Sequence, residues 1–132
     1  MAKPKSKSKG EVKISLQNLS MPELNYPVFC FKHLQTKPDK DYKFYTEFIL
    51  RLVKLCNLSW KEIDKTHKHS FGTEKMEIKF LKPDMPSFVT PDMDSLTVFR
   101  ANGDNRPFLG IRRSNVFHIL FIEEQFGDVY DH

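Results

Sequence analysis

The stretch LTVFRANGDNRPFLGIRRSNVFHILFI, residues 96–122, decides the fold. It contains three runs rich in β-favouring residues, separated by turn-forming sequences at residues 102–105 and 114–115. Consecutive strands joined by such short turns pair with their neighbours in an antiparallel meander. The sequence therefore predicts a three-stranded meander here.

The pairing of the last two strands also follows from the turn between them. A two-residue turn places Arg112 opposite Phe117 and Ile111 opposite His118. The third run, VFHILFI, is almost wholly apolar, which is typical of a central strand covered on both faces. We expect His118 to be a buried, hydrogen-bonded histidine of the core.

Elements upstream of the meander can be expected from the same kinds of pattern. The sequence favours strands over 12–16, 26–34 and 75–81, helices over 40–56 and 60–67, and a proline-rich connecting loop over 82–94. The predicted fold class is α+β, with two helices packed on an antiparallel β-sheet whose C-terminal part is the meander.

Two features support the helices. The first is one apolar stripe, which we expect to face the core: Tyr45, Phe48, Ile49, Leu52, Val53 and Cys56. The second is the capping box that Ser59 and Glu62 form at the start of the shorter helix, where Trp60 and Ile63 are expected in the core.

The length and charge of the chain indicate its domain organisation and its location. The 132 residues suffice for one ordinary domain, which we place at 11–132 behind a disordered basic tail at 1–10. The tail holds four of the 21 basic residues, which leaves 17 basic against 17 acidic residues in the body. We find no apolar run long enough to span a membrane and no secretory signal, so we expect a cytoplasmic protein.

The motifs of common enzymes are missing from the sequence. It has no phosphate-binding glycine loop, nucleophile elbow, HExxH helix or paired CxxC, and we expect neither a cofactor nor a metal. Cys30 and Cys56 are the only cysteines, and we expect two buried free thiols.

Arginines and histidines are the remaining candidates for chemistry. Metal-free cleavage of RNA requires a base for the 2′-hydroxyl, a cation for the phosphorane and an acid for the departing oxygen. Arg112 suits the second role, and Tyr130 and His132 suit the outer ones. The candidates for RNA contact are Arg100, Arg106, Lys75 and His67. The same side chains also suit a solvated sheet edge or loop.

The ending LTVFRANGDNRPFLGIRRSNVFHILFIEEQFGDVYDH, residues 96–132, resembles the C-terminal meander of the RelE/ParE-like toxins of bacterial toxin–antitoxin systems. The resemblance implies a small cytoplasmic toxin that cleaves mRNA, often on the ribosome, and that an antitoxin protein neutralises. It implies that Arg100, Arg106 and Arg112 handle phosphate, and that Tyr130 and His132 act in catalysis or stack on RNA.

Two other functions remain open at this point. One is a non-catalytic module of a phage or mobile element, which binds a host protein through an aromatic surface. The even charge of the body favours that module. The other is a gyrase-poisoning toxin of the same fold, which does not cleave RNA.

Overall fold

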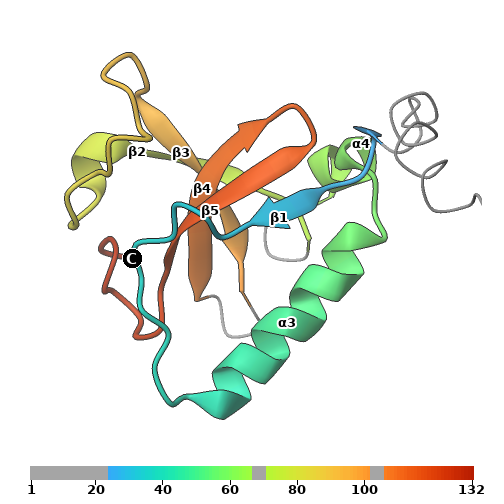
Figure 1. The fold of residues 1–132 in the computed structure, drawn as a ribbon, viewed down its shortest axis with the longest axis horizontal. Helices are drawn as coiled ribbons and strands as arrows, with labels where there is room; N and C mark the ends of the chain where they lie inside the picture. The colour runs from blue at the N-terminus through green and yellow to red at the C-terminus, as the bar shows by residue number, and fades with distance from the viewer. Residues whose placement is uncertain (1–23, 67–70, 102–105) are drawn as a thin grey trace, which may run out of the picture.

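The structure is a computed structural model that describes residues 24–66, 71–101 and 106–132. The predicted tail at 1–10 and the predicted strand at 12–16 lie outside the described residues. The described part forms one five-stranded sheet, in the order β1-β5-β4-β3-β2, with two α-helices (Figure 1). The elements are β1 (Val28–Cys30), α3 (Tyr42–Cys56), α4 (Trp60–Lys65), β2 (Glu74–Glu77), β3 (Ser95–Arg100), β4 (Pro107–Arg113) and β5 (Val116–Ile122).

The meander and the α+β class are confirmed. β2, β3, β4 and β5 pair antiparallel in sequence, while β1 adds to the far side of β5 as a parallel strand. β5 is thus an interior strand, as its apolar sequence predicts. β1 and β2 are shorter than the runs predicted at 26–34 and 75–81, and a 3-10 turn at Ile78–Phe80 follows β2.

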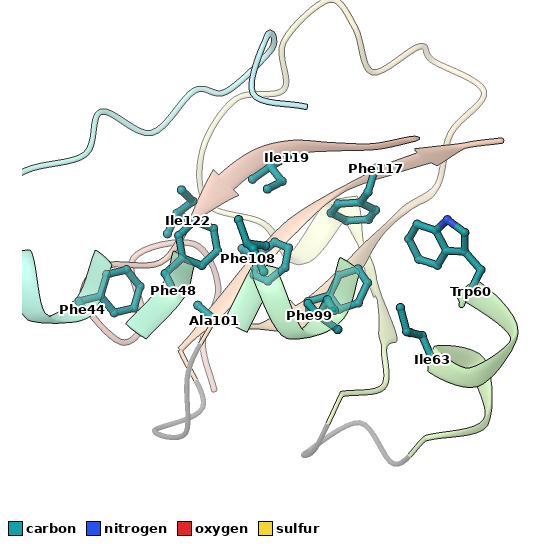
Figure 2. Packing of buried hydrophobic residues seen from close by; sticks show 12 residues of the cluster. Phe44, Phe48, Trp60, Ile63, Phe99, Ala101, Phe108, Phe117, Ile119 and Ile122 are labelled. Carbon is teal, nitrogen blue, oxygen red and sulfur yellow. The ribbon is translucent and has the colours of Figure 1, made fainter. Parts of the chain in front are cut away.

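One face of the sheet, here called the helix face, is covered by α3 and α4. Its core is dominated by aromatic rings, which meet edge to face or stacked with centroids about 5–6 Å apart (Figure 2). The rings of Phe99 and Phe108 stack at 5.0 Å, and Phe117 stands at 88° to Phe99. The buried members are Phe44, Phe48, Leu52, Leu55, Trp60, Ile63, Phe99, Ala101, Phe108, Phe117, Ile119 and Ile122.

The opposite face, here called the loop face, is covered by the proline-rich segment instead of by a helix. Leu96, Val98 and Leu109 are buried there beneath side chains that the segment supplies. The covering residues are Leu81, Met85, Phe88, Val89 and Met93, together with Met76 and Ile78 before them and Val129 and Tyr130 near the end of the sequence. The segment therefore serves as the second layer of the core.

The expected orientation of α3 is wrong by part of a turn. The helix buries Phe44, Phe48, Leu52 and Leu55, whereas Ile49, Val53 and Cys56 of the expected stripe are exposed. The apolar residues of α3 cover an arc that is wider than the sheet can bury, and the sheet takes the half that carries the two phenylalanines. Cys56 is consequently an exposed free thiol, and Cys30 is a half-buried one.

The start of α4 agrees with the prediction. The Ser59 hydroxyl accepts from the Glu62 amide at 3.1 Å, and the Glu62 carboxylate accepts from the Ser59 amide at 2.9 Å. This capping box is confirmed, and so is the burial of Trp60 and Ile63. The Trp60 indole also donates to the carbonyl of Asn115 at 3.1 Å, which ties α4 to the β4–β5 turn.

The predicted register of β4 and β5 is confirmed, because Arg112 pairs with Phe117 and Ile111 pairs with His118. Further along, Gly110 pairs with Ile119 while Leu109 pairs with Phe121, so that β5 holds one extra residue, Leu120. This β-bulge changes the alternation of β5: Phe121 lies on the loop face, and Ile122 lies on the helix face.

No helix within the described ranges is long and apolar enough to cross a membrane.

Candidate functional site

The bulge in β5 determines where the next residue, Glu123, points. Without it, strict alternation from Phe117 would send Glu123 to the helix face. With it, the fully buried carboxylate lies on the side of the loop face and accepts from the amide of Val129 at 2.9 Å. The other carboxylate oxygen lies 2.5 Å from Nε2 of His132. Glu123 therefore binds the end of the described chain back onto the sheet.

Aromatic rings enclose the His132 imidazole. The ring stacks on Phe126 with centroids 3.7 Å apart, and Tyr130 lies 4.4 Å away on a tilted plane. The His132 side chain is only 16% exposed, whereas Phe126 is 58% exposed. Phe126 is therefore the most exposed of the three rings.

Tyr130 connects the histidine to a buried cation. Burial is the main cause that raises the pKa of the Tyr130 phenol, although a hydrogen bond and the charge of Arg100 act against it. Arg100 is itself buried and pairs with Glu74 at 2.5 Å. The arrangement links Glu74, Arg100, Tyr130, His132 and Glu123 in that order, and we call these five residues the carboxylate–histidine cluster.

Three residues that the sequence singled out, Arg100, Tyr130 and His132, thus lie together. Two members of the cluster, Glu74 and Glu123, were not among the predicted site residues. An acid directly after an apolar strand was the available signal for Glu123, because such a carboxylate at the rim of a core needs hydrogen-bond donors.

Arg112 does not join the cluster. Its guanidinium lies over the Trp60 ring at 4.1 Å, its Nε donates to the Ser114 carbonyl at 2.8 Å, and Asp64 of α4 is 3.9 Å away. These contacts are on the helix face beside the β4–β5 turn, whereas Tyr130 packs on the loop face. The structure does not bring Arg112 together with Tyr130 and His132.

Arg106 and Lys75 also lie outside the cluster. Arg106 donates to the carbonyl of Glu124 at 2.6 Å and lies over the Phe44 ring at 4.0 Å, near the start of α3. Lys75 donates to the Thr97 hydroxyl at 2.7 Å across β2 and β3. His67, the remaining predicted RNA contact, lies outside the described residues.

His118 differs from the expected core histidine. It is half-buried, and its Nδ1 is enclosed without a hydrogen-bond partner among the described residues. The ring lies 4.8 Å from Phe88, which also stacks on His33 at 3.9 Å. Burial first, and then the charges of His33 and Arg113, lower the pKa of His118. This group therefore favours a neutral imidazole.

In the part of the chain that the structure describes, no group of three or more His, Cys, Asp or Glu side chains could hold a metal ion. The groups of the carboxylate–histidine cluster that could take part in a reaction are an oriented imidazole, a phenol and a guanidinium.

No protein-family model, curated protein or solved structure matches this chain.

Proposed function

We propose that the protein is a metal-independent endoribonuclease that acts as the toxin of a toxin–antitoxin-like system, and that the carboxylate–histidine cluster is its active site. The observation that supports this proposal is the contact of His132 with the buried Glu123, beside Tyr130 and Arg100. A carboxylate that accepts from one imidazole nitrogen fixes the ring orientation and the tautomer, as catalytic histidines require.

Each role in RNA cleavage then has a candidate. With its proton on Nε2 shared with Glu123, His132 offers Nδ1 to take the proton of the 2′-hydroxyl. The 2′-oxygen attacks phosphorus, the bond from phosphorus to the 5′-oxygen breaks, and the Tyr130 hydroxyl supplies the proton to that oxygen. Arg100 provides a permanent positive charge beside the phenol for the phosphorane. The exposed Phe126 ring is suited to stack on a base.

The assignment to Arg100 replaces the expectation for Arg112 because a phosphate held at Tyr130 cannot also reach the opposite face of the sheet. It gives the experiment a matched control. Both residues are arginines at strand positions of the same sheet, and only one of them belongs to the cluster.

The test is cleavage of a fluorescently labelled RNA in EDTA, with and without ribosomes. We expect products with 2′,3′-cyclic phosphate and 5′-hydroxyl ends. The rate should fall by about 10²–10⁴ in His132→Ala and by about 10²–10³ in Arg100→Ala. Arg112→Ala, compared at equal folded concentration, should retain the rate. No cleavage by the wild type under either condition, or an unchanged rate in His132→Ala, would refute the proposal.

A further inference from the structure

The outward side of α3 is apolar where a surface helix ordinarily carries charge. Tyr42 is 73% exposed, and Ile49, Leu50 and Val53 are each more than half exposed. Single exposed apolar residues are common, but a continuous row on one helix marks a surface that another molecule covers. We call this row the outer face of α3; it comprises Tyr42, Thr46, Ile49, Leu50, Val53 and Cys56.

The spacing of the outer face is that of a helix-pairing seam. Five of its six members follow one another at alternating intervals of four and three residues, which is the pattern that places side chains against a second helix. They are Tyr42, Thr46, Ile49, Val53 and Cys56, and all are exposed. In Figure 1, α3 runs along one side of the sheet. Its buried residues, Phe44, Phe48, Leu52 and Leu55, belong to the core on the helix face, and the outer face lies on the other side of the helix.

The outer face is also hollowed at the N-terminal half of the helix. A groove of about 400 Å³ is lined by Tyr42, Tyr45, Thr46, Ile49 and Leu50. The Tyr45 hydroxyl donates to Glu124, which holds this ring at the wall of the groove. Such a groove accepts one or two apolar side chains of a partner as anchors.

The charges along one edge indicate the chemistry of that partner. Lys43 and Lys54 are exposed and lie next to Leu50 around the helix, and Glu47, the single acid of α3, lies beyond Lys54. In an antiparallel pair of two copies, the two lysine edges would face each other, and their like charges would repel. A partner with acidic residues beside its apolar row is complementary to the same edge.

We infer that the outer face of α3 binds an amphipathic helix of another protein, with apolar residues at intervals of three and four and with acidic residues facing Lys43 and Lys54. The surface lies on α3, while the carboxylate–histidine cluster lies at the loop face. The inference therefore goes beyond RNA cleavage and does not depend on it.

Two synthetic helical peptides test the apolar spacing and the charge of the partner together. Both have leucines at alternating intervals of three and four residues, which we call the leucine seam. One carries glutamates along the flank of the seam, and the other carries lysines at the same positions. Binding to the full chain is measured by fluorescence anisotropy at low and high salt. We expect the acidic peptide to bind at least about tenfold more tightly, with a difference that shrinks as salt rises. Equal affinities, or binding of neither peptide, would overturn the inference.

Substitutions locate the binding surface. Ile49→Glu should weaken binding of the acidic peptide by about tenfold or more, whereas Phe80→Glu, at an exposed phenylalanine outside α3, should not change it. Both substituted side chains are more than half exposed, so both variants should keep the thermal midpoint of the wild type. Light scattering adds the alternative occupant: a dimer that Ile49→Glu dissociates would assign the face to a second copy and overturn the inference.

Discussion

Replacing Gly110 by alanine should be among the most damaging single changes in the sheet. A Cβ at this position would lie 1.9 Å from the carbonyl oxygen of His118, where real contacts of this kind begin near 3.0 Å. β4 and β5 would have to separate by about 1 Å beside the bulge, which stretches the ladder bonds beyond hydrogen-bonding distance. Overpacking costs about 1–3 kcal/mol and each weakened bond about 1 kcal/mol, so we expect a loss of about 3–5 kcal/mol.

The assay is urea unfolding, in which the midpoint and the slope together give the free energy of unfolding. Gly127→Ala is the matched control, because nothing lies within 4 Å of its Cβ position and only its φ of +96° resists a side chain. The backbone strain should cost about 1–2 kcal/mol. A loss below about 1 kcal/mol for Gly110→Ala would mean that the strands do not approach each other as described.

Two further predictions concern α4 and the loop face. Trp60→Ala should cost about 3–5 kcal/mol in urea unfolding, while Trp60→Phe should lose about 1–2 kcal/mol with the bond to Asn115; a cost below about 1 kcal/mol for alanine would contradict the burial of the ring. His118 has a lowered pKa, so the unfolded chain takes up its proton first and stability should fall as the pH drops below about 6.5. Between pH 8 and 5, the thermal midpoint should decline less steeply in His118→Phe, which has no titrating group at this position. It should also decline less steeply in Arg113→Gln, because the charge of Arg113 is one cause of the lowered pKa. An unchanged slope in His118→Phe would exclude His118 as the origin of the pH dependence.

The meander could be predicted because its pairing is set locally. The two-residue turn at Ser114 and Asn115 fixes which residues of β4 and β5 face each other, and Ser114 has the positive φ, 58°, that such turns require. The capping box of α4 is local in the same sense. The orientation of α3 is not local, because apolar residues on two sides of the helix compete for one sheet, and the sequence of the helix alone does not rank them.

The carboxylate–histidine cluster could be predicted only in part. Arg100, Tyr130 and His132 attract notice by residue type. The inward direction of Glu123, however, depends on the bulge at Leu120, and a bulge has no signature in an unbroken apolar run. The separation of Arg112 from Tyr130 has a related cause. The segment after β5, which carries Tyr130, folds back over one face of the sheet only, and the pattern of the strands does not predict which face that is.

The position of β5 has a consequence for synthesis of the chain. β5 follows the other four described strands in the sequence, yet it lies between β1 and β4, and the Thr36 hydroxyl that bonds to Ile122 is 86 residues away from it. During translation, β1 therefore has no strand to pair with until β5 has been made. Until then, Phe99 and Phe108 also lack their edge-to-face contacts with the Phe117 ring. A growing chain that ends before Val116 should expose these rings and the unpaired side of β4. Nascent chains of this protein should accordingly depend on chaperones until β5 emerges, and should then complete the described sheet in one late step.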